Sequence, residues 1–477
     1  MALPTDGLVL VVKRDCPTCE LIAPVAKTLQ DSNRLSHVLS QDDPSFPDGL
    51  DVIDDRELEG SFGLDIEIVP TLIRRESGTE TARAIGWHRG EWQTLTGDDS
   101  LGLDLPEQQP GCGSLSVAPG MNEELRVRFG DAGLKSRTVS VGYPDDEIEQ
   151  MFDRGWTDGL PVVPPTPARV LRMLDGTTRP ADDIIGNVPP SLTACSIEKA
   201  AVNAVMAGCR PEYFPVVIAA LEAAIEPNFS WYGLLSTTMG VGPVVVVNGP
   251  VTKRIGMNWG MNVLGHGNRA NSTIGRALQL ISSNVGGAKP GGIDRSTLGH
   301  PGKRGVCFAE DETDETWESL ATSRGIAPDT SAVTVFAGCG ASVFMDQISK
   351  DAGSLAKSLA SGLRGVGHPK HVQSYGAMLV LSPEHWQVFK RAGWSRSNVH
   401  EAIHDASIRP GEELVHGAGG ITEGMPLQFA DGDHAKFADD ALVITQAGGH
   451  AGLMSVIIPG WDAGSTGTIP ITKEIKS

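Results

Sequence analysis

The chain lacks any long hydrophobic run. In its 477 residues, no apolar stretch approaches the roughly 18–20 residues that span a bilayer. The N-terminal sequence MALPTDGLVLVVKRD has neither the basic region nor the small-residue cleavage site of a secretory signal peptide. We therefore expect no membrane partner and a cytoplasmic location.

Several function-bearing motifs are also missing. The 57 glycines and 31 prolines form no collagen-like period and no low-complexity tract. No strand leads into G-x-G-x-x-G, and there is no P-loop, so the sequence implies no bound nucleotide. The pairs His368/His371 and His400/His404 have metal-ligand spacing, but there is no HExxH and we predict no metal site.

Positive charge is scarce in the first third of the chain. Residues 1–150 contain 28 Asp and Glu against 13 Lys and Arg, a net charge of −15, while the other 327 residues carry only −5 of the total −20. A field of that sign repels nucleic acid and anionic membranes. The difference also divides the chain into an acidic front part and a larger, nearly neutral part.

Cysteine is uncommon, and the count of seven is odd. Scattered through a long chain without a secretion signal, these residues form a poor disulfide framework and favour reactive or buried thiols. We interpret Cys195, Cys209 and Cys307 as small core residues.

The sequence Cys16-Pro17-Thr18-Cys19 lies where a short strand, 8–12, turns into a helix with apolar residues at three- and four-residue spacing. Unpaired amides at a helix N-terminus stabilise a thiolate, which is the attacking species. We expect Cys16 to be exposed and Cys19 to lie a turn deeper. Half of a zinc site has the same spacing, but no second CxxC or HxxxH lies nearby.

Together with the sequence that follows it, the CPTC motif resembles the thioredoxin family. About fifty residues after CPTC comes Val69-Pro70-Thr71, then a hairpin and a last helix. The resemblance implies a thioredoxin-like domain over 1–100, with Cys16 as nucleophile and Cys19 as resolving thiol. It also implies a cis Pro70 that positions a substrate thiol, and a cellular thiol reductant or a thioredoxin-reductase-like donor as partner. The acidic segment at 40–57 is longer than that fold needs, which leaves the partner surface open.

Residues 101–142 are rich in Gly, Pro, Ser and Asp and have little periodicity, so we predict a linker. Its sequence GCGS places Cys112 between two glycines. One interpretation is an exposed bystander thiol. The other, which we favour slightly, is a mobile relay that reaches back to Cys16 and exchanges through a mixed disulfide.

Residues 143–477 alternate continuous apolar strands with helices. Strands are expected at 241–249, 332–338, 377–382, 441–449 and 453–460, and helices at about 272–283, 343–363, 383–392 and 397–406. This pattern predicts an α/β domain with a mixed or parallel sheet. Both VVVVNGPVTKRIG and MLVLSPEHWQVFKRAG consist of a strand, a proline, a basic helix and a glycine. An internal duplication is one interpretation, and a generic β-α unit is the other.

The stretch 256–281 concentrates Gly, Asn and His ahead of an amphipathic helix that we expect to be capped at 271–273. Helix amides and an arginine suit a carboxylate or phosphate, so a pocket for a small polar or anionic substrate is one hypothesis. A purely structural loop is the other. The candidate substrate-binding residues are Asn262, His266, Asn268, Arg269 and Asn271.

A second Gly-Cys-Gly occurs in TVFAGCGASVF, where Cys339 follows an expected strand and precedes an expected helix. Nucleophiles of α/β enzymes are often mounted at that position. Cys339 is therefore a candidate substrate-facing thiol.

The larger part of the chain also resembles an uncharacterised bacterial family related to the UGSC-type (seleno)proteins. The resemblance rests on GWTDGLPVVPPT, VMAGCRPEY, NRANSTIGRA and NVGGAKPG. It implies one α/β domain and no assigned reaction.

Together these features favour a thiol-dependent oxidoreductase. The front domain would deliver two electrons from Cys16 and Cys19, through Cys112, to a small-molecule substrate held near Cys339, with no cofactor beyond the cysteines. Alternatives are a thiol-dependent lyase or sulfur transferase, and a soft-metal-handling protein. The protein could also form a homo-oligomer.

Overall fold

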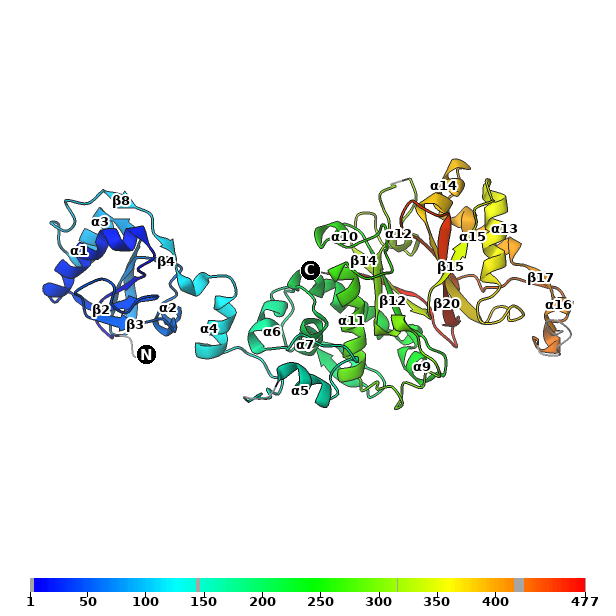
Figure 1. Ribbon diagram of the computed structural model, residues 1–477, viewed down its shortest axis with the longest axis horizontal. Helices are drawn as coiled ribbons and strands as arrows, with labels where there is room; N and C mark the ends of the chain where they lie inside the picture. Colours follow the sequence, from blue (N-terminus) through cyan, green and yellow to red (C-terminus); the bar gives the residue numbers. More distant parts are fainter. Residues whose placement is uncertain (1–3, 143–145, 315, 416–423, 477) are drawn as a thin grey trace. The chain divides into compact units, whose positions relative to one another are not determined.

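The computed structural model describes residues 4–142, 146–314, 316–415 and 424–476 (Figure 1). Contacts divide the chain into two compact units: Met1–Gly133 with Pro167–Arg172, and the remainder. We had placed the end of the first domain at residue 100 and a linker over 101–142. The first unit instead continues to Gly133, because the segment after residue 100 packs on it.

The first unit is built on a five-stranded mixed sheet. β1 pairs with β2, and β2 with β3, in parallel, whereas β5 is antiparallel to both β1 and β6. The order across the sheet is β3 (Val52–Asp54), β2 (Leu35–Ser40), β1 (Gly7–Val12), β5 (Thr71–Glu76) and β6 (Thr79–Ile85).

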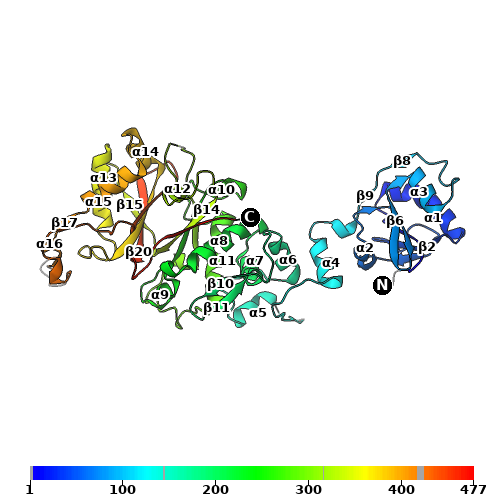
Figure 2. The ribbon, with the colours of Figure 1, turned by 180° about the vertical axis from the view of Figure 1, so that it is seen from behind.

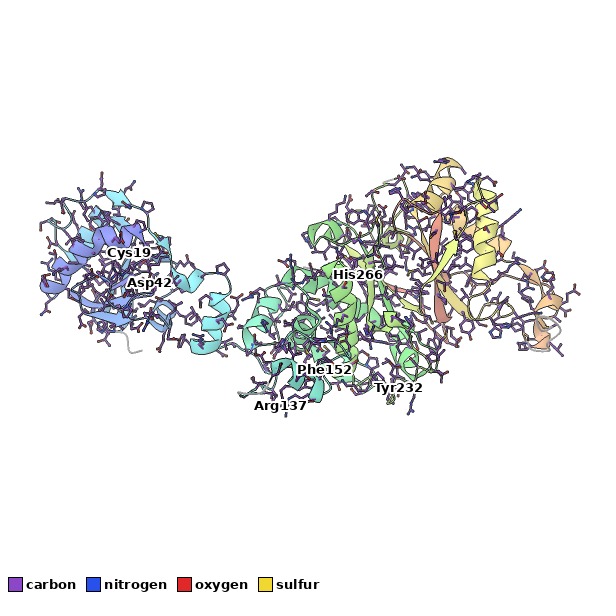
Figure 3. The ribbon with its side chains drawn as sticks, in the orientation of Figure 1. Cys19, Asp42, Arg137, Phe152, Tyr232 and His266 are labelled. Carbon is purple, nitrogen blue, oxygen red and sulfur yellow. The ribbon has the colours of Figure 1, made fainter. Side chains whose placement is uncertain are left out.

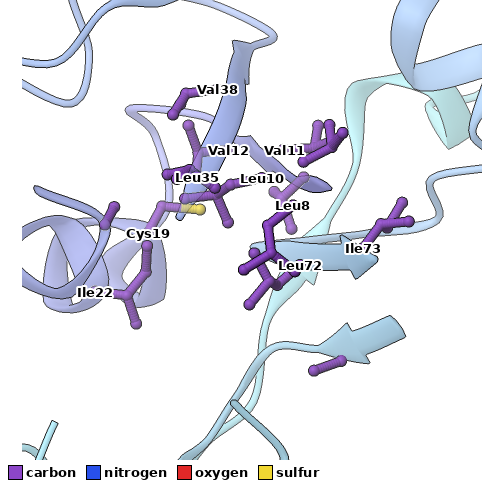
Figure 4. Close-up of a cluster of buried hydrophobic side chains, with 14 of the residues drawn as sticks. Leu8, Leu10, Val11, Val12, Cys19, Ile22, Leu35, Val38, Leu72 and Ile73 are labelled. Carbon is purple, nitrogen blue, oxygen red and sulfur yellow. The ribbon is translucent and has the colours of Figure 1, made fainter. Parts of the chain in front are cut away.

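Helix α1 (Pro17–Asp31) follows β1 directly. Its predicted apolar face is buried against the sheet, since Ile22, Ala26 and Leu29 are almost fully excluded from solvent. Figure 4 shows the Cys19 side chain pointing from α1 toward the buried side chains of β1. The strand-to-helix junction predicted at CPTC is therefore confirmed.

Short elements complete the first unit. α4 packs on α2, and two-residue strands after residue 100 pair back onto earlier ones: β8 with β7 and β9 with β4. These elements are α2 (Glu59–Gly63), β4 (Ile68–Val69), β7 (Trp87–His88), α3 (Arg89–Thr96), β8 (Gln108–Gln109), β9 (Cys112–Gly113), η1 (Leu115–Val117) and α4 (Met121–Phe129).

The second unit contains an eight-stranded mixed sheet. Six strands follow one path, in the order β13 (Val306–Ala309), β12 (Gly242–Asn248), β14 (Ala332–Gly338), β20 (Met454–Asp462), β16 (Tyr375–Leu381) and β19 (Leu442–Gln446). Off this path, β15 (Ser342–Met345) pairs with β20, and β21 (Ile471–Glu474) with β14. The α/β class and the mixed sheet are thus as predicted.

Helices of the second unit gather in two groups, one around α7 and α11 and the other around α13 and α15 (Figures 1 and 2). Two small pairs, β10 (Ile184–Val188) with β11 (Thr193–Ser196) and β17 (Arg409–Pro410) with β18 (Asp433–His434), lie outside the main sheet. α6 (Pro167–Leu174) is divided between the units, since Pro167–Arg172 belongs to the first. The other helices of the second unit are α5 (Glu147–Asp153), α7 (Ile197–Ala207), α8 (Phe214–Ala224), α9 (Trp231–Ser236), α10 (Val251–Arg254), α11 (Arg269–Asn284), α12 (Leu320–Ser323), α13 (Ala352–Leu363), α14 (Pro383–Arg391), α15 (Arg396–Ala406) and α16 (Gly411–Val415), with 3₁₀ turns η2 (Pro211–Tyr213), η3 (Pro227–Phe229), η4 (Pro301–Arg304) and η6 (Leu427–Phe429).

The same arrangement occurs twice in this unit. α8 precedes β12, which pairs in parallel with β13 and antiparallel with β14. α13 precedes β16, which pairs in parallel with β19 and antiparallel with β20. α11 lies between β12 and β13 in the chain, and α15 lies between β16 and β19. This is the arrangement that an internal duplication would produce.

The two outer strands of the six-stranded path approach each other. The backbone N–H of Asp311, just after β13, donates to the carbonyl oxygen of Gln446 on β19 over 2.7 Å. The sheet therefore curves back on itself. Its enclosed face carries a core drawn from both halves, including Val246, Phe336 and Met378.

One expected helix is wrong. Residues 343–363 were predicted as a single helix, but β15 occupies 342–345 and α13 begins only at Ala352. Ser342–Met345 instead pairs antiparallel with β20. Cys339 is consequently followed by a strand, and not by a helix N-terminus. In the part of the chain that the structure describes, no helix has both the length and the apolar character needed to cross a bilayer.

A three-cysteine candidate redox site

Cys16 is the N-cap of α1. Its backbone is extended, and its sulfur accepts the Cys19 backbone N–H over 3.4 Å. The same sulfur lies 3.5 Å from the Val69 carbonyl oxygen. Because α1 is fifteen residues long and its first amides lack helical partners, this end of the helix favours a negative charge on sulfur.

Two thiols donate to the Cys16 sulfur. Hydrogen bonds from the Cys19 side chain, and then from the Cys112 side chain, lower the pKa of Cys16 from 9.0 to about 5, against the opposing effect of burial. A thiol with that pKa is ionised at neutral pH. Cys16 is therefore the thiolate of the group, which is the state a nucleophile of disulfide exchange requires.

Cys19 is the most deeply buried of the three thiols. Burial first, and then its hydrogen bond to Cys16, raises the pKa of Cys19 far above its ordinary value. The thiol is fully excluded from solvent and belongs to the hydrophobic core of the first unit. A protonated thiol held against the Cys16 thiolate is suited to attack later, once Cys16 carries a disulfide.

The third cysteine, Cys112, is placed in the site by the pairing of two short strands. β9 pairs antiparallel with β4, so Cys112 is opposite Val69 and Gly113 is opposite Ile68. The Val69–Pro70 peptide bond is cis, as the resemblance implied, and Pro70 is buried. The hydrogen bond to Cys16 first, and then burial, raise the pKa of Cys112.

Residues 106–116, here called the cysteine segment, are fixed at the end that precedes Cys112. The Trp87 indole N–H donates to the carbonyl oxygen of Pro106 over 2.7 Å, and β8 pairs with β7. The hydroxyl of Thr18, the second residue of α1, donates to the carbonyl oxygen of Pro110 over 2.6 Å. The approach to Cys112 is therefore tied to both the sheet side and the helix side of the site.

The other end of the cysteine segment is held by a buried polar network. The Gln41 amide donates to Ser114 Oγ over 2.6 Å and to Ser61 Oγ over 2.8 Å, and its oxygen accepts the Leu115 N–H. The Ser116 hydroxyl donates to a backbone carbonyl of the first unit over 2.5 Å. Gln41, Ser61, Ser114 and Ser116 are all buried.

Glycine at 111 is required by this docking. A Cβ there would lie 2.4 Å from Ile68 Cγ2 and 2.6 Å from the Val69 carbonyl oxygen. At Gly113 a Cβ would meet nothing within 4 Å. The glycine before Cys112 is thus a packing requirement, whereas a side chain in place of the glycine after it would enter open space.

Two expectations about these thiols change. Cys16 was predicted to be exposed, but it is only 1% exposed, because the cysteine segment lies beside it. Cys112 was predicted to be mobile, but both sides of it are anchored. Cys112 is partly exposed, so it is the most accessible sulfur of the three.

Sequence reasoning missed the residues that dock the segment: Lys13, Thr18, Gln41, Ser114 and Ser116. The Lys13 ammonium donates to the Gly113 carbonyl oxygen over 2.8 Å and opposes the rise in the pKa of Cys112. The hydrogen bonds from Lys13, Thr18 and Gln41 to the cysteine segment join residues more than seventy positions apart. The only sequence signal was a Ser-x-Ser in a segment otherwise typical of a loop.

In the second unit, the Asn-rich loop uses its side chains internally. Asn268 caps α11 by accepting the Asn271 N–H, so the cap precedes the expected 271–273. Asn271 is buried and bonded to the backbone of Asn258. Asn262 donates to the His266 carbonyl oxygen over 2.8 Å.

The remaining side chains of that loop point to the same conclusion. Arg269 donates to the Gly208 carbonyl oxygen over 2.9 Å. The His266 side chain is exposed, on the loop before α11 (Figure 3). These contacts favour the structural-loop alternative over an anion pocket.

Cys339 lies at the end of β14 and is partly exposed. Burial raises its pKa to about 11, although the nearby Lys303 ammonium opposes this. The thiol is therefore protonated at neutral pH. Burial likewise raises the pKa of Cys195 and Cys209 to about 12 and that of Cys307 further, consistent with their interpretation as core residues.

Comparison with known proteins gives no assignment, since no family model, curated protein or solved structure matches this chain.

Proposed function

We propose that the first unit is a thiol–disulfide oxidoreductase with Cys16 as nucleophile and Cys19 as resolving thiol. The observation that carries the proposal is the Cys16 sulfur at the N-terminus of α1, accepting from Cys19 and Cys112. The pKa of Cys16 is lowered while that of the neighbouring Cys19 is raised, and strongly shifted pKa values are common at functional sites. The thioredoxin-like order of elements, with β5 following Pro70 beside β1, supports the same chemistry.

The reaction consists of two consecutive thiol–disulfide exchanges. The Cys16 thiolate attacks a disulfide R–S–S–R, forming a mixed disulfide and releasing one thiolate. Cys19 then attacks the Cys16 sulfur, forming the Cys16–Cys19 disulfide and releasing the second thiol. The substrate gains two electrons, the dithiol loses two, and a cellular dithiol reductant restores the reduced site.

The experiment is a stoichiometric one. Fully reduced protein, freed of excess reductant, is mixed with oxidised glutathione, and the products are counted. We expect two glutathione thiols per chain and a Cys16–Cys19 disulfide in the peptide map. A protein that releases no glutathione thiol and forms no Cys16–Cys19 disulfide would contradict the proposal.

A metal-handling role predicts a different result. Soft thiolates would retain Cu(I) or Hg(II), and the metal content would fall in Cys16→Ser. Metal content measured on wild type and on Cys16→Ser separates that alternative from disulfide exchange. The proposed chemistry needs no group from the second unit, where the contacts of the Asn-rich loop and of Cys339 favour structural roles.

A further inference from the structure

The cysteine segment lies where a substrate strand would have to bind. β4 is only two residues long, and its backbone pairs with Cys112 and Gly113. Extended peptides bind proteins by adding a strand to an exposed sheet edge. Here that edge, next to Val69 and the Cys16 sulfur, already has a partner from the same chain.

The three cysteines differ in their exposure to solvent. Cys19 is 0% exposed and Cys16 1%, whereas Cys112 is partly exposed. A disulfide arriving from solvent therefore meets Cys112 before Cys16.

Resting on the disulfide-exchange function proposed above, we propose that Cys112, and not Cys16, makes the first attack on the substrate, so that Cys16 then attacks the mixed disulfide on Cys112. We propose also that the substrate is a small disulfide and not a cysteine within a polypeptide strand. The anchors on both sides of Cys112 hold its sulfur beside Cys16, so the second exchange needs no large movement. Proximity of this kind converts a bimolecular exchange into an intramolecular one.

The steps balance as three exchanges. Cys112, after passing its proton to the Cys16 thiolate, attacks R–S–S–R, forming Cys112–S–S–R and releasing RS⁻. Cys16, deprotonated again, attacks the Cys112 sulfur, forming Cys16–S–S–Cys112 and releasing the second RS⁻. Cys19 attacks the Cys16 sulfur, forming Cys16–S–S–Cys19 and returning Cys112 to the thiol. One substrate disulfide becomes two thiols, and the Cys16/Cys19 dithiol supplies both electrons.

Two groups assist the first step. Lys13, bonded to the Gly113 carbonyl oxygen, places a positive charge near Cys112 and favours its thiolate. The Cys16 thiolate accepts the Cys112 proton along the hydrogen bond that already joins the two sulfurs. Coupled groups of this kind share one negative charge, which can move to either sulfur.

The test compares a small disulfide with a protein disulfide. Single-turnover reduction of oxidised glutathione and of insulin is measured for the full-length wild type, Cys112→Ser, Gly111→Ala and Gly113→Ala. We expect Cys112→Ser to lose about tenfold or more of the rate with oxidised glutathione while its circular dichroism is unchanged. Gly111→Ala should lower the rate with glutathione disulfide and raise that with insulin, because the added methyl displaces the segment from Val69. Gly113→Ala is the matched control and should resemble wild type.

Trapping identifies the first thiol directly. In Cys16→Ser, which cannot resolve the first adduct, glutathione should be found on Cys112 by peptide mass spectrometry. The inference alone is overturned if Cys112→Ser reduces oxidised glutathione at the wild-type rate, or if Gly111→Ala accelerates both substrates, as a segment that merely blocks Cys16 would predict. If wild type reduces neither substrate, the proposed function itself is wrong, and the inference falls with it.

Discussion

The two Gly-Cys-Gly sequences, 111–113 and 338–340, have very different surroundings. Cys112 lies on a two-residue strand opposite Val69, and its thiol donates to the Cys16 sulfur. Cys339 lies at the end of β14, where burial raises its pKa to about 11. In both sequences the first glycine is packed too closely for a Cβ, and the second is less crowded.

This difference shows that a cysteine flanked by glycines indicates close backbone packing and does not by itself indicate a reactive thiol. Gly338 is excluded from carrying a Cβ by Val244 and Ile458 of the sheet core, and Gly111 by Ile68 and Val69. What distinguishes Cys112 is a neighbouring thiolate at a helix N-terminus. Reactivity follows from that neighbour.

The largest difference is expected when one thiol is removed from each region. Cys16→Ser should slow the release of both glutathione thiols from oxidised glutathione by roughly ten-thousandfold or more, because the mixed disulfide on Cys112 can no longer be resolved. Cys339→Ser should stay within about twofold of wild type, because a protonated, partly buried thiol contributes little to exchange. A large loss in Cys339→Ser would place that cysteine in the reaction.

The second test is the pH at which thiolate appears. The lowered pKa of Cys16 predicts a rise in thiolate absorbance, in the fully reduced protein, centred near pH 5. The signal should disappear in Cys16→Ser and remain in Cys339→Ser, since the Cys339 pKa is about 11. A single rise near pH 9 in wild type would contradict the hydrogen bonding described for Cys16.

The same shift has a consequence for stability. A thiol whose pKa is lower in the folded than in the unfolded state stabilises the fold fully above the unfolded pKa, here near 9, and ceases to do so as the pH falls through about 5. The reduced first unit should therefore gain stability from pH 5 to pH 9 relative to Cys16→Ser. Unfolding in denaturant at several pH values measures this difference.

A smaller effect is expected from the glycines around Cys112. Gly111→Ala should destabilise the docked segment by about 1–3 kcal/mol, since the new methyl overlaps Ile68 and Val69. Gly113→Ala should change it by less than about 0.5 kcal/mol. Hydrogen–deuterium exchange of peptides covering 106–116 measures both. Equal exchange in the two variants would argue against the close approach at Gly111.

The smallest effect is expected at the helix-side anchor. Thr18→Val removes the hydrogen bond to the Pro110 carbonyl oxygen and should cost about 0.5–1.5 kcal/mol of segment docking. Thr28→Val is a matched control on the same helix, since its hydroxyl bonds only within α1. Faster exchange over 106–116 in Thr18→Val alone would support the anchor, and unchanged exchange in both variants would not.

Much of the fold could be predicted because it is encoded locally. The alternation of apolar strands and amphipathic helices predicted β14, α14 and α15 within about one residue of their observed bounds. The expected helix at 343–363 was wrong because β15 is set by its partner β20, far away in sequence. Short strands such as β13 and β21 carry too few residues to show a period.

The site could be predicted only in part, for the same reason. CPTC at a strand-to-helix junction gives Cys16 and Cys19 from local sequence alone. The docking of Cys112 depends on contacts with Lys13, Thr18 and Gln41, which lie from seventy to a hundred residues away. Without periodicity, residues 101–118 resemble a linker, and neither the burial of Cys16 nor the anchoring of Cys112 follows from composition.

The most direct test of the central claim, that Cys112 and Cys16 are neighbours that exchange disulfides, uses Cys19→Ser. Without the resolving thiol, the variant is oxidised with one equivalent of oxidised glutathione, digested, and mapped by peptide mass spectrometry. The account predicts a disulfide that joins the Cys16 and Cys112 peptides. Glutathione retained on Cys16 with Cys112 free, or a disulfide joining Cys16 to Cys339, would contradict it.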